Sequence, residues 1–201
     1  MHDETKSRAD ILQSVRQYNP GPVEMPSLNR DWIAYADRVQ QFSDTLQFVG
    51  GTCVPVPDLA AVRSYLQDFE PFIAAKFVYS LLPDVIESTR DISAISDPHD
   101  LEAIDLALVP GDFAVAENGA VWVTDRDLKH QRAALFLAQH LTLVVRREEL
   151  LDNMHQAYQR LQFQGVGFGT FLSGPSKTAD IEQSLVIGAH GPRSLIVFLV
   201  G

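Results

Sequence analysis

Cysteine and basic residues are both scarce in this sequence. Cys53 is the only cysteine among the 201 residues, so the chain cannot form an internal disulfide, and it has no Cys/His cluster of the kind that binds zinc or an iron–sulfur cluster. Lys and Arg together number 16 against 26 Asp and Glu, which gives a formal net charge of −10. Binding to nucleic acid or to an anionic membrane surface needs a positive field. We therefore expect neither as a partner.

Long hydrophobic runs are also missing. The longest apolar stretches, such as residues 195–200, are far too short to span a bilayer. The first residues read Met-His-Asp-Glu-Thr-Lys, which is too polar for a secretory signal, so we expect a cytoplasmic protein. With 46% hydrophobic residues the chain can bury one substantial core, and its length favours a single folding unit.

Strand and helix patterns alternate along most of the chain. Short apolar runs predict buried strands at residues 52–56, 77–82, 104–109, 141–145 and 195–200. Helical patterns occur over residues 5–18, from Asn29 to about residue 50, after Asp58 and over 150–161. This alternation predicts an α/β fold with a three-layer, mostly parallel open sheet over residues 51–201, preceded by an N-terminal helical segment over 1–50. The last strand is apolar on both faces, as a central parallel strand should be.

The stretch around Glu117-Asn118-Gly119 has the strongest turn signal. Asn-Gly suits a type I′ turn, and the alternation on both sides predicts a tight hairpin in which Val115 pairs with Trp122. Two interpretations of Glu117 stay open. It is either a solvated neighbour of the turn, or a carboxylate at a rigid strand end that acts as a nucleophile toward acyl groups or as a general base.

A second stretch, residues 173–178, reads Ser-Gly-Pro-Ser-Lys-Thr. The preceding glycines lack the spacing of a dinucleotide-binding fingerprint, and Lys177-Thr178 follow Gly174 too late for a phosphate-binding loop. We predict a strand that ends near Leu172, a turn, and a helix that starts near Thr178.

Three interpretations of residues 173–178 stay open. They form an ordinary capped helix, a subunit interface, or a site at a helix N-terminus that binds a carboxylate or phosphate. In the last case the hydrogen-bond donors are Ser173, Ser176, Lys177 and Thr178.

His190 and Arg193 lie just before the last predicted strand. Loops at strand boundaries are where α/β proteins place their sites. His190 is therefore either an acid or base beside residues 173–178 or part of a structural turn, and Arg193 is a candidate to neutralise an anion. The six histidines show no metal-binding spacing, and we predict no metal site.

These motifs together resemble a known family. Residues 173–183, the following Gly188-Ala-His-Gly-Pro192 and the closing apolar strand resemble the signature of the lactate-utilisation protein C family (the LUD domain, YkgG-like proteins). Residues 111–119 are similar to a second block of that family, which usually reads Glu-Thr-Gly, so that Asn118 departs from the commoner form. The resemblance covers about residues 100–201. It implies the fold shared by glucosamine-6-phosphate deaminase, ribose-5-phosphate isomerase and CoA-transferases.

The resemblance also implies a function. Proteins of this kind accompany two iron–sulfur proteins in a bacterial system that oxidises L-lactate to pyruvate. We therefore expect an accessory or regulatory subunit that binds a small carboxylate or acyl anion, with no cofactor of its own and with iron–sulfur clusters only in its partners. Glu117 and His190 would face the reactive end of that anion. The expected binding residues are Ser173, Gly174, Ser176, Lys177, Thr178, Arg193, Asn118 and Gly119.

Two other functions stay open. Glu117-Asn118-Gly119 resembles the Glu-Asn-Gly motif of CoA-transferases, in which the glutamate forms a thioester. The chain would then be an enzyme with Glu117 as its nucleophile. It would otherwise be an assembly protein without catalytic activity.

Overall fold

The computed structural model describes residues 4–18, 21–28, 30–128, 131–161, 167–179 and 185–201. The chain divides into two compact units, Met1–Asp31 and Trp32–Gly201. The first unit contains helix α1 (Glu4–Gln17), which confirms the helix predicted over residues 5–18. No helix in the described ranges has the length and apolar character needed to cross a membrane.

A five-stranded parallel sheet forms the centre of the second unit. Its strands lie in the order β1-β11-β6-β3-β2, and every neighbouring pair is parallel. This confirms the predicted α/β fold with a mostly parallel open sheet, and β11 has a partner on both sides as predicted. The bounds are β1 (Thr52–Val56), β2 (Val78–Ser80), β3 (Leu106–Pro110), β6 (His140–Arg146) and β11 (Ser194–Val200).

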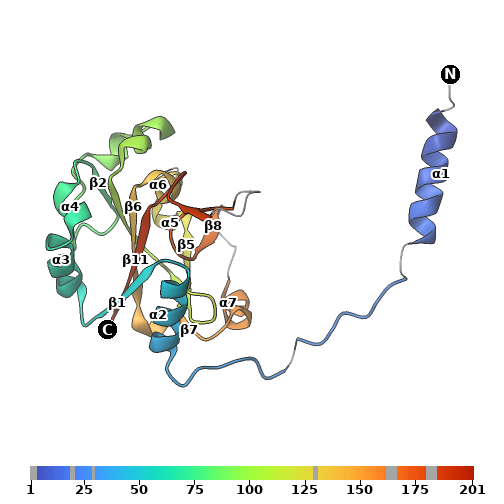
Figure 1. Ribbon diagram of the computed structural model, residues 1–201, viewed down its shortest axis with the longest axis horizontal. Coiled ribbons are helices and arrows are strands. Elements are labelled where there is room, and N and C mark those ends of the chain that lie inside the picture. Colours follow the sequence, from blue (N-terminus) through green and yellow to red (C-terminus); the bar gives the residue numbers. More distant parts are fainter. Residues whose placement is uncertain (1–3, 19–20, 29, 129–130, 162–166, 180–184) are drawn as a thin grey trace. The chain divides into compact units, whose positions relative to one another are not determined.

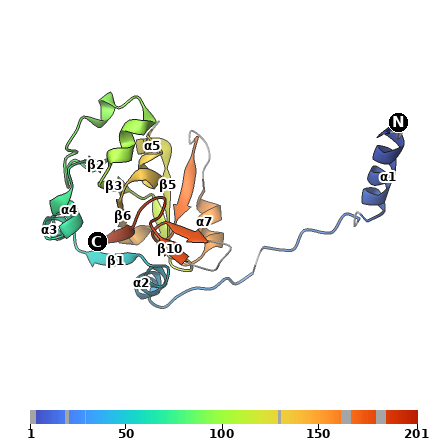
Figure 2. The ribbon, with the colours of Figure 1, turned by 45° about the horizontal axis from the view of Figure 1, so that its top comes forward.

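Helices α3 and α4 pack on one face of this sheet, and α2 and a second sheet pack on the other (Figures 1 and 2). The second sheet has the order β7-β4-β5-β8, and the strands β9 and β10 form a separate antiparallel pair. The bounds are β4 (Phe113–Val115), β5 (Ala120–Thr124), β7 (Leu150–Leu151), β8 (Gly169–Leu172), β9 (Lys177–Ala179) and β10 (Leu185–Ile187). The helices are α2 (Arg38–Phe48), α3 (Leu59–Gln67), α4 (Glu70–Ala74), α5 (Asp125–Leu128), α6 (Ala134–Leu137), α7 (Met154–Arg160) and the 3-10 turns η1 (Ile92–Ala94), η2 (Pro98–Ala103) and η3 (Arg147–Glu149).

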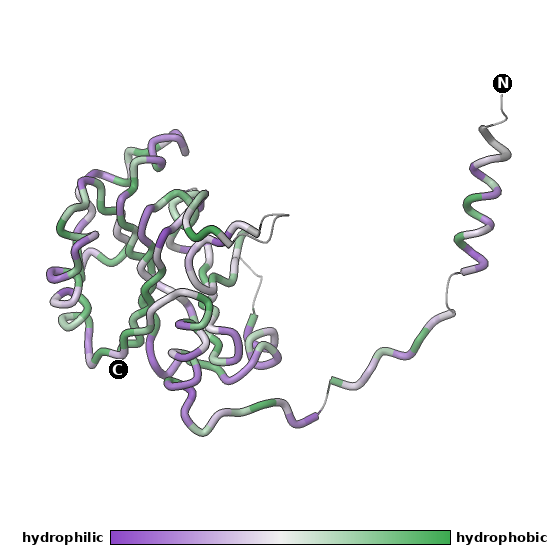
Figure 3. Tube along the Cα trace, viewed as in Figure 1, coloured by the Kyte–Doolittle hydropathy of each residue, from purple (hydrophilic) through white to green (hydrophobic). Residues whose placement is uncertain are grey.

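The core follows the alternation of side chains along the central strands. Every second side chain points to one face of the sheet, where Ile196 and Phe198, for example, pack with Val62 and Leu66 of α3. The side chains between them point to the opposite face and pack against α2 and the inner face of the second sheet. The outer face of the second sheet is covered by α7. The most hydrophobic segments of Figure 3 accordingly run along the central strands.

Three helices differ from the sequence-based expectation. The helix predicted from Asn29 begins only at Arg38, after Asp37, whose carboxylate accepts a hydrogen bond from Gln40 N; Asn29 itself lies outside the described residues. The helix predicted over 150–161 begins at Met154, because residues 150–151 pair with β4 as strand β7. The helix predicted near Thr178 is absent, since residues 177–179 form β9. Its expected continuation over 180–184 is not among the described residues.

The predicted cap of α3 is confirmed. Asp58 precedes Leu59 and accepts a hydrogen bond from Ala61 N at 2.8 Å. This satisfies one of the free N–H groups at the start of a helix.

Candidate functional site

The Glu117-Asn118-Gly119 segment joins β4 to β5 by a longer turn than predicted. Val115 lies opposite Ala120, so the predicted pairing of Val115 with Trp122 is wrong. Residues 116–119 form the turn, and the N–H groups of residues 116 and 117 donate to the carbonyls of residues 151 and 152, at 2.9 and 3.0 Å. Backbone hydrogen bonding to β7 and its extension therefore overrides the local preference for a two-residue turn.

The carboxylate of Glu117 supports the start of α7. Its Oε2 atom accepts a hydrogen bond from Met154 N at 2.8 Å. Asn153 adds a second cap, because its Oδ1 atom accepts from Gln156 N at 3.0 Å. Glu117 thus satisfies a backbone donor that a helix leaves free at its first turn.

Asn118 and Gly119 are held by neighbouring segments. The Asn118 carbonyl accepts a hydrogen bond from Ser173 Oγ at 2.8 Å, and its side chain accepts from Ala120 N at 3.2 Å. Gly119 has φ +62°, and a Cβ atom there would lie 2.9 Å from Leu46 N. The structure thus places Ser173 in direct contact with this turn.

Residues 173–176 and 190–192 form a second contact. Ser176 N donates to the Pro192 carbonyl and Ser176 Oγ donates to the His190 carbonyl, each at 2.9 Å. Gly174 has φ +75°, and a Cβ atom there would lie 2.4 Å from the Val49 carbonyl oxygen. His190 therefore lies next to residues 173–176, as predicted. The contact is built largely from hydrogen bonds between these segments themselves.

A cavity of about 210 Å³ lies between these two segments, and we call it the loop cavity. Its polar lining residues are Ser173, Ser176 and His190. The rest of its lining is mainly apolar, with Leu135, Phe136, Leu141, Phe171, Leu172, Pro175 and Pro192.

The predicted cations do not line the loop cavity. Lys177 Nζ lies 3.4 Å from the Ser173 carbonyl oxygen and 3.5 Å from that of Pro175. Thr178 lies in β9 opposite Val186. Because β9 is a strand, the helix N-terminus that was expected to attract an anion is not formed at these two residues.

Arg193 lines a different cavity of about 210 Å³ at the amino ends of the central strands. Asp105, Gln139 and His140 share that lining. Burial lowers the pKa of His140 below its ordinary value, and the Arg193 guanidinium lowers it further. Asp105 opposes this shift, but its Oδ2 atom already accepts from Lys76 N and Phe77 N, at 2.7 and 2.9 Å.

A further cavity of about 280 Å³ is lined by residues that were not among the predicted site residues. We call it the arginine cavity. It is lined by Asp112, Phe113, Trp122, Thr124, Arg126, Arg160 and Leu161. Asp112 follows the end of β3 by two residues, so the cavity adjoins the carboxyl edge of the central sheet, where ligands of open α/β sheets commonly bind. Asp112 lies three residues after the strand predicted at 104–109, and this position was the signal that could have identified it.

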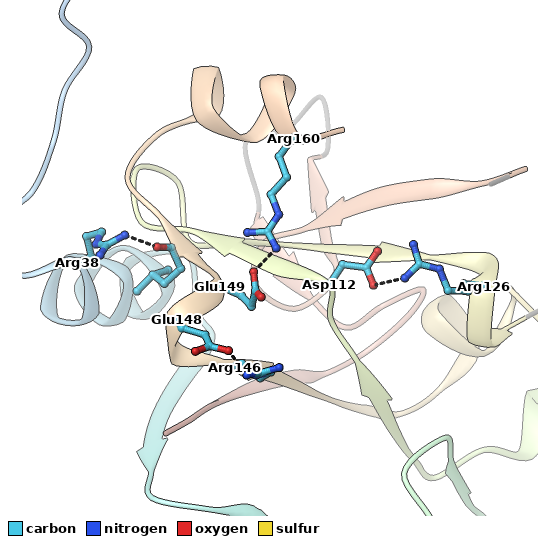
Figure 4. Close-up of polar contacts among 8 residues, drawn as sticks. Arg38, Asp112, Arg126, Arg146, Glu148, Glu149 and Arg160 are labelled. Carbon is cyan, nitrogen blue, oxygen red and sulfur yellow. Dashed lines mark hydrogen bonds and ion pairs between the residues drawn. The ribbon is translucent and has the colours of Figure 1, made fainter. Parts of the chain in front are cut away.

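The charged groups of the arginine cavity form two pairs (Figure 4). Arg126 Nη1 lies 3.8 Å from Asp112 Oδ1, and Arg160 forms an ion pair with Glu149. Thr124 Oγ1 donates to Asp112 Oδ2 at 3.3 Å. The guanidinium of Arg160 also lies over the ring of Phe113, 5.3 Å from its centroid. In the described ranges, no group of three or more His, Cys, Asp or Glu side chains is arranged to hold a metal ion.

Comparisons with known proteins agree with the motifs. The model of the LUD domain matches residues 95–200. Lactate utilization protein C of Shouchella clausii (strain KSM-K16) is 34% identical over 105 residues, which cover 49% of this chain and 45% of that protein. Lactate utilization protein C of Anoxybacillus flavithermus (strain WK1) is 31% identical over 159 residues, or 76% of this chain and 66% of that protein. The match thus spans less than half the length of the first relative and about two thirds of the second.

A solved structure supports the fold. The crystal structure of a DUF162 family protein from Deinococcus radiodurans superimposes with a TM-score of 0.61 at 21% sequence identity. The superposition covers 84% of this chain and 99% of that chain. At this sequence identity the likeness shows the fold alone.

Proposed function

We propose, on the premise that this chain belongs to the LUD domain family, that it acts in lactate utilisation as a ligand-binding component. The LUD domain model matches residues 95–200, more than half of the 201 residues. The relatives that support the process are named Lactate utilization protein C. The ligand proposed for this chain is a small carboxylate or acyl anion.

The observation that favours binding over covalent catalysis is the hydrogen bond of Glu117. Its carboxylate accepts from Met154 N, and its backbone N–H donates to the Asp152 carbonyl. Through these contacts Glu117 stabilises the start of α7. This structural role requires no acyl chemistry. A nucleophilic glutamate would instead need its oxygens directed at a substrate.

Iron–sulfur proteins are the proposed partners. Oxidation of a 2-hydroxy acid releases electrons that must pass to an acceptor. A sequence with Cys53 as its single cysteine does not provide the thiolates that commonly hold an iron–sulfur cluster. Electron-carrying clusters therefore belong to other subunits in this proposal.

Glu117→Gln tests the proposal directly. Glutamine keeps an oxygen that accepts from Met154 N but cannot form the acyl intermediate of a CoA-transferase. We expect the variant to restore growth on L-lactate, as the wild type does, in a bacterium that lacks its own lactate utilization protein C. Glu102→Gln, at an exposed position of the same domain, is the matched control.

Three results would contradict this proposal. Loss of growth in Glu117→Gln alone, together with a hydroxylamine-sensitive adduct on wild-type protein incubated with acetyl-CoA, would favour the CoA-transferase-like enzyme. If the bacterium grows equally well on L-lactate without the gene for this chain, the chain has no role in lactate utilisation. If growth depends on the chain but calorimetry with lactate, pyruvate and CoA gives no heat, the assembly protein is favoured.

A further inference from the structure

The arginine cavity combines an anion-binding group with a hydrogen-bond acceptor. Arg126 Nη1 is 3.8 Å from Asp112 Oδ1, which is longer than a hydrogen bond, and the Arg126 side chain is 66% exposed. A guanidinium group has five N–H donors in a planar fork that matches a carboxylate. Arg126 therefore retains donors for a carboxylate that enters the cavity.

Asp112 supplies the acceptor. Its side chain is 28% exposed, and only its Oδ2 atom accepts the hydroxyl of Thr124, at 3.3 Å. Oδ1 faces Arg126 (Figure 4) at 3.8 Å, which is longer than a hydrogen bond, so it can accept from a further donor. Arg160 is engaged by Glu149, so it adds positive charge nearby while its guanidinium is already paired.

Two aromatic side chains form an apolar surface in the same cavity. Phe113 and Trp122 line it and are mutually stacked, with ring centroids 6.3 Å apart. Both are almost completely buried, at 3% and 8% exposure, so they are fixed by packing. Because little of either ring is exposed and the Arg160 guanidinium lies over Phe113, only a substituent as small as a methyl group would contact them.

We propose that the arginine cavity binds a small 2-hydroxy carboxylate. The carboxylate pairs with Arg126, the hydroxyl donates to Asp112, and the substituent on the second carbon packs on Phe113 and Trp122. This inference rests on the proposed function, because it assigns the site and the chemical class of the ligand.

Asp112 determines the selectivity of this site. A 2-oxo acid presents a carbonyl oxygen without a hydrogen, which would face the carboxylate of Asp112 and be repelled. An α-amino acid presents an ammonium group, which would enter a cavity lined by the two guanidinium groups of Arg126 and Arg160, and the Glu149 carboxylate is already paired with Arg160. A hydroxyl group needs a single acceptor and carries no charge, so it is the substituent that fits.

Three ligands with the same carbon skeleton test this selectivity by calorimetry: L-lactate, pyruvate and L-alanine. We expect wild-type protein to bind lactate at least about tenfold more tightly than pyruvate or alanine, since one hydrogen bond to a charged group is worth about 1.5 kcal/mol or more. Asp112→Asn should reduce the preference over pyruvate to about twofold, because an amide also donates to a carbonyl oxygen. Arg126→Gln should weaken lactate and pyruvate alike, by about tenfold.

Arg146→Gln is the matched control. Arg146 is an exposed arginine that pairs with Glu148 and does not line the cavity, so its removal should leave all three affinities unchanged. Circular dichroism of each variant verifies that it is folded. Equal affinity for pyruvate and lactate, tighter binding of alanine, or an unchanged lactate affinity in folded Arg126→Gln would overturn the inference.

The two proposals fail in different ways. Growth on L-lactate that depends on this chain, without selective binding at the arginine cavity, removes the inference and leaves the proposed function. Selective binding of lactate by a chain that growth does not require removes the proposed function and leaves the site.

Discussion

The loop cavity and the arginine cavity differ in how their polar groups are used. In the loop cavity, Ser173 and Ser176 donate to the carbonyls of Asn118 and His190, so the motif residues bond one another. In the arginine cavity, Arg126 and Asp112 remain 3.8 Å apart and partly exposed. The difference shows that the serines of the loop cavity join segments of the fold, whereas the charged groups that remain partly exposed line the arginine cavity.

The largest effect is expected at Gly174. A Cβ atom there would lie 2.4 Å from the Val49 carbonyl oxygen, at a residue with φ +75°. Gly174→Ala should lower the free energy of unfolding by about 2–4 kcal/mol, through backbone strain and overpacking. Urea denaturation measures this change.

Gly21→Ala is the control, because a Cβ atom at Gly21 meets no heavy atom within 4 Å. Its stability should match that of the wild type. If Gly174→Ala is equally stable, residues 173–176 are not packed as described, and the comparison between the two cavities loses its basis.

A smaller loss is expected when the support of α7 is removed. Glu117→Ala leaves Met154 N without its acceptor and should cost about 1 kcal/mol of stability. Glu117→Gln should recover most of this loss, because the amide oxygen can accept the same hydrogen bond. Thermal unfolding followed by circular dichroism compares the two. A Glu117→Ala variant as stable as the wild type would show that the carboxylate does not stabilise α7.

Ser176→Ala separates the two cavities by function. It removes the hydrogen bond to the His190 carbonyl and should lower stability by about 1 kcal/mol. Lactate affinity should stay within about twofold of wild type, whereas the tenfold loss expected for Arg126→Gln marks the other cavity. A tenfold loss of affinity in Ser176→Ala would instead place the ligand in the loop cavity.

The smallest effect extends the comparison to the amino edge of the sheet. Burial and Arg193 lower the pKa of His140 below its ordinary 6.5. Above that pH the histidine is neutral in both states and contributes nothing. As the pH falls below 6.5, the unfolded chain binds the proton more readily, so the protein loses stability until the folded pKa is passed.

His140→Gln should therefore reduce the fall in unfolding temperature between about pH 7.5 and pH 5.5. His99 provides a contrast. Its pKa is raised, chiefly by its hydrogen bond with Asp97, so its contribution has the opposite sign. His99→Gln should enlarge the fall, and an equal response of both variants would contradict this account of His140.

Local sequence patterns were sufficient for the central sheet. Strand β1 has the predicted bounds. Strands β6 and β11 contain the predicted runs, because a strand buried on both faces needs a continuous apolar segment. Asp58 was identified as a helix cap because its side chain interacts within three residues of its own position.

Local sequence patterns predicted the wrong secondary structure where hydrogen bonds to distant segments determine the backbone conformation. Residues 150–151 resembled the first turn of a helix, but pairing with β4 makes them strand β7. Residues 177–179 resembled a helix start, but they pair with β10. Both are short segments whose intrinsic preference is weaker than the hydrogen bonds offered by a neighbouring strand.

The sequence by itself determined the α/β class, the parallel central strands and the resemblance to the LUD domain, because each depends on local runs of residues. Only the tertiary structure decided where Glu117 and Arg193 point, and only the tertiary structure brought Asp112, Arg126 and Arg160 to one cavity. These three residues come from β3's end, α5 and α7, and no spacing along the chain relates them. The physical reason is that a binding site depends on distances in space, which the packing of the two sheets and α7 establishes.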